Sequence, residues 1–258
     1  MMASVRRALG VRVKKVRKGK AVAPRAVSLK GSAEETPSTS SSDTRITSAT
    51  LQTALTHLGN ADPVLGRMIR TLGPPKTLVR RLEAPGSAFT SLVRSIVGQQ
   101  LSTKAASSIY SRLVELVGPE ATPATILDCD PQDLRAIGLS GRKVEYVKDL
   151  ARHFDSGAVS DEALGKMSEG DVMKSLIAVR GLGEWSVHMF QIFHLGMADV
   201  LPVGDLGVKK GAAALYTKSK KAVTKEDLEE IGSKWAPHRS LGSWYMWRAQ
   251  EFLDKEKT

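Results

Sequence analysis

Apolar residues recur every three or four positions along most of the chain, which is the period of an amphipathic α-helix. The segments that share this spacing are residues 50–58, 63–72, 89–97, 105–116, 131–137, 140–154 and 168–179. Gly73-Pro74-Pro75 ends the second of them, and Ser168 with Asp171 is typical of a helix start. No segment alternates apolar and polar residues as a strand would. The pattern therefore predicts an all-α, two-lobed domain with a cleft between the lobes.

The net charge of the chain is concentrated at its amino-terminal end. The 258 residues carry a formal charge of +11 at pH 7. Residues 1–30 hold ten Lys and Arg and no acid, which leaves 28 Lys and Arg against 27 Asp and Glu in the rest. Residues 1–45 end in a Ser/Thr-rich stretch with few large apolar side chains, so we expect a disordered tail before a domain at 46–258. Any binding of that domain to DNA must depend on local geometry rather than on net charge.

The basic run from Arg12 to Lys20 allows three interpretations. It is typical of a nuclear import signal or of an arm that binds nucleic acid. Because the segment is Arg-rich, contains serine and has no acid before Glu34, it also fits a transit peptide for the mitochondrion or plastid. The third interpretation is a tail that only adds solubility. We expect no membrane span, since no run of eighteen apolar residues occurs.

The most informative stretch is Val179-Arg180-Gly181-Leu182-Gly183-Glu184-Trp185-Ser186. Two glycines around one apolar residue predict a tight hairpin between helices, with Leu182 pointing inward. Backbone amides of Gly181, Gly183 and the following helix would then face outward, at a positive helix end that suits a phosphate oxygen. Such a contact positions a duplex without reading its sequence. A plain helix–helix turn is the alternative that this fragment alone leaves open.

Asp205 stands about twenty residues further on, in Leu201-Pro202-Val203-Gly204-Asp205-Leu206-Gly207. Its position before an apolar helical segment predicts that it caps a helix. A carboxylate can also stabilise the positive charge that develops on deoxyribose when an N-glycosidic bond breaks, and can orient the attacking water. The two roles are compatible with each other.

Five segments in order resemble the helix–hairpin–helix DNA glycosylase superfamily, and within it the 3-methyladenine DNA glycosylase II branch. The segments are residues 92–102, 137–143, 176–187, 201–210 and 235–248, and the resemblance spans residues 50–252. It implies a helix–hairpin–helix motif and places Asp205 at the family's catalytic aspartate. Trp185 falls where bifunctional relatives carry a lysine that forms a Schiff base, which implies a monofunctional enzyme. The single cysteine, Cys129, separates the chain from the iron–sulfur members.

The resemblance implies further site residues, each with a structural alternative. Trp185 would form a wall of the base pocket, or else be a buried core aromatic. Gln100 or Leu101 would fill the gap left by a flipped nucleotide, or else cap a helix and pack in the core. Met189 and His238 stand where a bacterial relative has pocket aromatics, and His238 can instead be a surface histidine, without partners for a metal site.

Basic residues near the acid have similar alternatives. Lys209 would face phosphate or solvent, and Arg239 would brace Asp205 or a neighbouring carbonyl. The spacing of Trp244, Tyr245 and Trp247 favours a place in the core. No organic cofactor is implied, although hairpin carbonyls could hold a structural monovalent cation.

Together these features predict a monofunctional DNA glycosylase that excises alkylated purines, 3-methyladenine and 7-methylguanine, from double-stranded DNA in base excision repair. We expect it to act as a monomer. One alternative is a catalytically silent module that binds damaged DNA through the same hairpin. Another is a helical scaffold that binds protein through its tail. The acid at position 205 favours the enzyme, because a pure binder gains nothing from a carboxylate beside an anionic backbone.

Overall fold

The computed structural model describes residues 45–119, 121–217 and 222–257. The expected tail up to residue 44, with its basic run and the localisation that depends on it, lies outside these ranges. Arg45 is already part of the fold, one residue before the expected boundary. It pairs with Met197 in an isolated antiparallel bridge. Its guanidinium donates to the carbonyls of Leu195 at 2.6 Å and Gly165 at 2.8 Å.

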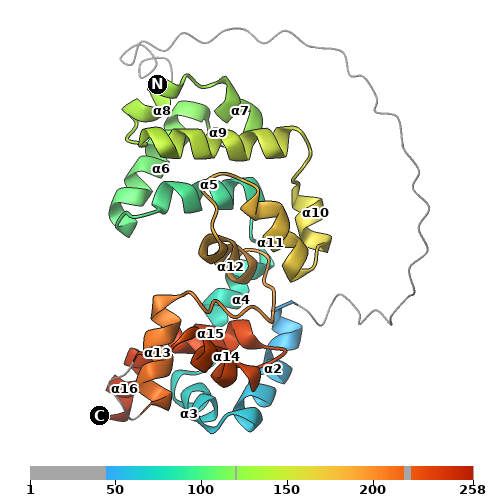
Figure 1. The fold of residues 1–258 in the computed structure, drawn as a ribbon, viewed down its shortest axis with the longest axis vertical. Helices are drawn as coiled ribbons and strands as arrows, with labels where there is room; N and C mark the ends of the chain where they lie inside the picture. Colours follow the sequence, from blue (N-terminus) through green and yellow to red (C-terminus); the bar gives the residue numbers. More distant parts are fainter. Residues whose placement is uncertain (1–44, 120, 218–221, 258) are drawn as a thin grey trace, which may run out of the picture. The chain divides into compact units, whose positions relative to one another are not determined.

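The described chain is all-α, as expected (Figure 1). Its helices are α2 (Ser48–Ala61), α3 (Pro63–Leu72), α4 (Lys76–Glu83), α5 (Ala88–Gly98), α6 (Thr103–Val117), α7 (Pro123–Asp128), α8 (Pro131–Ala136), α9 (Gly141–Asp155), α10 (Asp161–Lys166), α11 (Glu169–Ile177), α12 (Glu184–Phe193), α13 (Leu206–Tyr216), α14 (Lys225–Ser233), α15 (Arg239–Trp247) and α16 (Ala249–Glu256). None of the described helices combines the length and apolar character needed to cross a bilayer.

Every segment with helical spacing in the sequence forms a helix, whereas α4, α7, α10, α14 and α16 lie outside those segments. α4, α7 and α10 have six or eight residues each, about two turns or fewer. Such lengths are too short for an apolar period to repeat. α7 did carry another signal, since Thr122 and Thr125 form a capping box around Pro123.

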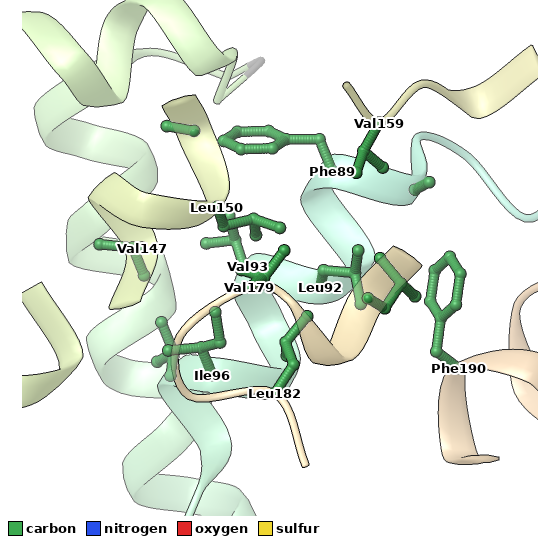
Figure 2. Close-up of a cluster of buried hydrophobic side chains, with 14 of the residues drawn as sticks. Phe89, Leu92, Val93, Ile96, Val147, Leu150, Val159, Val179, Leu182 and Phe190 are labelled. Carbon is green, nitrogen blue, oxygen red and sulfur yellow. The ribbon is translucent and has the colours of Figure 1, made fainter. Parts of the chain in front are cut away.

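Two hydrophobic clusters organise these helices and correspond to the two expected lobes. Side chains of α5 to α12 form the first, and side chains of α2 to α4 and α13 to α16 form the second. Figure 2 shows part of the first cluster, where Leu182 of the hairpin points inward among side chains such as Ile96 and Val179. Phe193 and Trp247 pack against both clusters, and their rings are 5.3 Å apart. The lobes therefore meet at these two aromatic rings.

Candidate active site and DNA interface

The glycine hairpin joins α11 to α12 as the sequence predicts. Gly181 has a φ of 85°, a backbone conformation that residues other than glycine rarely adopt. A Cβ at this position would also overlap the ring of Tyr146. Leu182 is buried, with 5% of its surface exposed, and its N–H donates to the carbonyl of Val179 at 3.2 Å. Buried leucine and close-packed glycine thus fix the shape of the turn.

The start of α12 has no side-chain cap. Its N-cap is Gly183, which has no side chain to accept from the first N–H groups. By contrast, Ser140 caps α9 and Asp205 caps α13 through side-chain oxygens. Within the ranges that the structure describes, no acceptor binds the N–H groups of Gly181 and Gly183. Free amides at a positive helix end are suited to bind a phosphate oxygen.

The loop after α5 lies against this hairpin. The side-chain amide of Gln99 donates to the carbonyl of Gly181 at 2.7 Å. Gln100 is exposed and has a φ of 57°, the positive φ of a non-glycine residue that costs free energy. Leu101 is exposed to 39%, so it does not pack in the core as the structural alternative required. Gln100 and Leu101 are therefore both exposed, in a loop that is bonded to the hairpin.

Asp205 caps α13, as expected, and its carboxylate is tightly held. Oδ1 accepts from the N–H of Val208 at 2.7 Å and from Nε1 of Trp247 at 2.8 Å. Oδ2 accepts from Nε1 of Trp185 at 2.6 Å. The residue keeps 7% of its surface exposed. The acid thus lies beside the first turn of the helix that follows the hairpin, where the sequence argument requires it.

Trp185 is not a core aromatic. Half of its surface, 50%, is exposed, although its indole N–H is bound to Asp205. A large aromatic ring that is fixed at one edge and open to solvent is a preformed platform on which a planar group can stack. The structure therefore argues against the core alternative for this residue.

A second aspartate shows what a purely structural version of this arrangement looks like. Asp62 caps α3, is 2% exposed, and accepts from Nε1 of Trp235 at 2.9 Å and from the hydroxyl of Tyr216 at 2.7 Å. Trp235 is completely buried. Both aspartates cap a helix and accept from an indole, but the indole bound to Asp62 is completely buried, whereas Trp185, bound to Asp205, is half exposed.

Sequence reasoning missed the role of Trp247. Its helical spacing suggested core, and it does pack against both clusters, but its indole N–H also binds Asp205. The contact requires a residue without a side chain at position 207. A Cβ there would lie 2.7 Å from Cδ1 of Trp247 and 3.0 Å from Oδ1 of Asp205. The glycine two residues after the acid was the only sequence signal for this approach.

The remaining predicted residues lie elsewhere or are only partly placed. Arg239 does not brace Asp205, because it forms a bidentate pair with Asp199 at 2.7 and 2.9 Å. The ring of His238 lies 5.3 Å from that of His57 in α2. Burial, together with His57, lowers the pKa of His238 despite the opposing charge of Asp199.

Met189 is half-buried against the first cluster, and Lys209 is half-buried in the first turn of α13. Among the described residues, no group of three or more His, Cys, Asp and Glu side chains could hold a metal ion.

Comparison with known proteins places this geometry in a family. Residues 93–238 match the family model described as "HhH-GPD superfamily base excision DNA repair protein". DNA-3-methyladenine glycosylase 1 of Schizosaccharomyces pombe is 30% identical over 78% of this chain and 88% of its own length. DNA-3-methyladenine glycosylase 2 of Escherichia coli is 26% identical over 68% of this chain and 63% of its own length. A solved structure of S. pombe 3-methyladenine DNA glycosylase in complex with abasic DNA superposes with a TM-score of 0.66, at 30% identity, over 76% of this chain and 95% of that chain.

Proposed function

Because the chain belongs to the HhH-GPD superfamily of base excision DNA repair proteins, we propose that it excises alkylated purines, namely 3-methyladenine and 7-methylguanine, from double-stranded DNA. The enzyme is a DNA glycosylase and hydrolyses the N-glycosyl bond between base and deoxyribose. The observation that carries the proposal is the buried carboxylate of Asp205 bound to a half-exposed indole next to the hairpin.

The hydrogen bonds of Asp205 suit it to stabilise a cation. Its three donors are all neutral, so they hold the carboxylate in place without cancelling its charge. Of roughly four lone-pair directions on a carboxylate, Oδ1 uses two and Oδ2 uses one. The remaining direction on Oδ2 can bind the attacking water or face the sugar as positive charge develops there.

The proposed substrates need little from the rest of the pocket. Purines alkylated at N3 or N7 already carry positive charge, so they leave as neutral bases without a general acid. The open ring of Trp185 can stack on such an electron-poor base, an interaction worth about 1–2 kcal/mol, and Met189 can form a soft wall beside it. The ring of His238 contacts that of His57, and we propose no contact between His238 and the base. Since residue 185 offers no amine for a Schiff base, we propose a monofunctional enzyme that leaves the abasic site uncut.

The proposed DNA contacts follow from the exposed groups around the hairpin. The N–H groups of Gly181 and Gly183 bind a phosphate, and Lys209 approaches the same backbone. Gln100 or Leu101 enters the gap that the flipped nucleotide leaves. A monovalent cation at the hairpin would need backbone carbonyls as ligands. Those of Val179 and Gly181 each accept one hydrogen bond, from the N–H of Leu182 and the side chain of Gln99.

Asp205→Asn is the direct test. The amide keeps the shape of the side chain but removes its charge, so release of 3-methyladenine from methylated duplex should fall on the order of 100- to 1,000-fold. Chromatography of the freed base measures it. Asp62→Asn is the matched control, because it changes the other helix-capping, indole-bound aspartate. It should lower the unfolding temperature while the folded enzyme keeps its rate.

Two results would contradict the assignment. Wild-type turnover in Asp205→Asn would remove the acid from the chemistry. Tight binding of abasic duplex by the wild-type protein with no base released from any alkylated substrate would favour the silent damage-binding module instead.

A further inference from the structure

Helix α9 contacts both the glycine hairpin and the loop of Gln99, Gln100 and Leu101. We name this loop the gap loop. Three residues of α9 contact these two segments, namely Lys143, Tyr146 and Asp149. They are three residues apart and so share one face of the helix. The same helix packs against α5, whose end leads into the gap loop.

Lys143 holds the start of the gap loop. Its Nζ donates to the carbonyl of Val97 at 2.8 Å and to that of Gln99 at 2.7 Å. These carbonyls lie at the end of α5, where a cation is favoured by the negative end of the helix dipole. The side chain is half-buried, and burial lowers its pKa from the ordinary lysine value. The ammonium is therefore committed to backbone carbonyls.

The other two residues hold the hairpin. The ring of Tyr146 fills the space next to Gly181. Oδ2 of Asp149 accepts from the backbone N–H of Arg180 at 3.0 Å, and Arg152 binds Oδ1 of the same carboxylate at 2.9 Å. Gln99 links the gap loop directly to the hairpin, since its side chain donates to the carbonyl of Gly181. One helix face thus sets the gap loop and the hairpin in fixed register.

We propose that Lys143 is a positioning residue, which keeps the gap loop in register with the hairpin so that both engage the same lesion. The inference rests on the proposed function of the loop and the hairpin. Its physical basis is the positive φ of Gln100, an unfavourable conformation that persists only while the flanking carbonyls are held. Without the ammonium, the loop relaxes and the side chain that fills the gap no longer points into the duplex.

The test is Lys143→Met in the full chain, which keeps the length of the side chain and removes its donors. The probe is a duplex with a tetrahydrofuran abasic analogue next to 2-aminopurine, whose fluorescence rises when a neighbouring side chain unstacks it. We expect the fluorescence rise to be lost and the affinity for this duplex to fall about tenfold, as for removal of a hydrogen bond to a charged group. Release of 3-methyladenine should fall by a similar factor.

Lys148→Met is the matched control. Lys148 lies on the same helix, is also half-buried, and donates in the same way to two carbonyls at the end of α7, those of Leu127 at 3.1 Å and Cys129 at 2.7 Å. It touches neither the gap loop nor the hairpin in the described contacts. Its substitution should cost comparable stability and leave the fluorescence rise and the affinity within twofold of the wild type.

Equal fluorescence in the wild type and Lys143→Met, or equal losses in the two lysine variants, would overturn the proposal. If Lys143→Met does not fold, Gln99→Leu carries the same test, because it cuts the bond from the gap loop to Gly181. A wild-type fluorescence signal in that variant would also overturn it. The abasic probe needs no base excision, so failure of the proposed glycosylase activity would show separately, in the release assay of the wild-type protein.

Discussion

At the scale of single residues, Trp185 is the side chain to which we assign a part in both binding and chemistry. Its indole N–H is bound to the carboxylate of Asp205, and half of its surface is free. Trp247 contributes the other indole donor but is largely packed between the two hydrophobic clusters. The two tryptophans therefore hold the same acid, and Trp185 is the more exposed of the two.

Trp185→Phe separates these two contributions. Phenylalanine keeps an aromatic face and loses the donor, and a hydrogen bond to a charged group is worth about 1.5–3 kcal/mol. We expect base release at saturating substrate to fall roughly tenfold or more, with a smaller change in the affinity for abasic duplex. Trp244→Phe is the control, since the ring of Trp244 faces Arg248 instead of the acid. Equal rates in wild type and Trp185→Phe would show that the bond to Asp205 has no part in the reaction.

At the scale of elements, the acid depends on how closely α13 approaches the end of α15. Asp205 is the N-cap of α13 and Trp247 is the last residue of α15, so the bond between them joins two helix ends. Gly207 lies between the two side chains, with space for hydrogen only. This packing decides whether the carboxylate of Asp205 keeps its hydrogen bond from Trp247.

Gly207→Ala should therefore disturb the site more than the fold. The new methyl group would lie 2.7 Å from Cδ1 of Trp247 and must push that ring away. We expect at least a tenfold loss of base release with a modest loss of stability, because tryptophan remains packed on its other side. At Gly204 a Cβ meets nothing within 4 Å, so Gly204→Ala is the control. Kinetics and thermal unfolding of both variants measure the contrast, and equal kinetics in the two would contradict it.

The attachment of the hairpin to α9 should depend on pH through Asp149. Burial alone would raise the pKa of Asp149, but the N–H of Arg180 and the charges of Arg152 and His153 outweigh it and hold the pKa below its ordinary value. The carboxylate then contributes stability that is fully present above its ordinary pKa of about 3.9 and is lost as pH falls through the lower, folded value.

Asp149→Asn should consequently unfold at a lower temperature than the wild type at pH 7, and the difference should shrink below about pH 4. Thermal unfolding at pH 7 and pH 3 measures this. The exposed Asp155, at the end of the same helix, supplies the control Asp155→Asn. A deficit in Asp149→Asn that is the same at both pH values would mean that the charge does not contribute.

At the scale of the whole molecule, charge is divided unevenly between the tail and the domain. Residues 1–30 hold ten bases and no acid, while the rest of the chain is almost neutral. In the proposed complex, a nearly neutral domain that binds phosphate through backbone amides would draw little affinity from counterion release. If the basic segment is a nucleic-acid arm, it supplies most of the long-range attraction to DNA.

Replacing the six bases between Arg12 and Lys20 by glutamine tests that interpretation. Each phosphate contact that is lost lowers the slope of log affinity against log salt by about 0.9. An arm predicts a clearly shallower slope with unchanged base release at low salt. An import signal or transit peptide predicts no change in the slope and a change of compartment in cells.

Most of the fold could be predicted from the sequence, because long amphipathic helices and their caps are local properties. The hairpin and the cap at Asp205 followed from glycine, leucine and aspartate at fixed places. The hydrogen-bond donors to the acid did not, since Trp247 comes from another helix end and its packed ring looks like core at helical spacing. The contacts of Lys143 could not be predicted for a similar reason. The sequence does not show whether a lysine at a helix start contacts solvent or the carbonyl of a neighbouring segment.

The two roles that we propose for the indole of Trp185, stacking on the base and binding Asp205, constrain how this protein could change its preference among damaged bases. A substitution that reshapes the stacking face would also release one oxygen of the acid, so altered selectivity would come with slower bond cleavage. Adaptation to new lesions should therefore proceed through Met189, a half-buried neighbour on the same helix with no described bond to the acid. Variants selected for a new substrate should keep tryptophan at 185 and vary at 189.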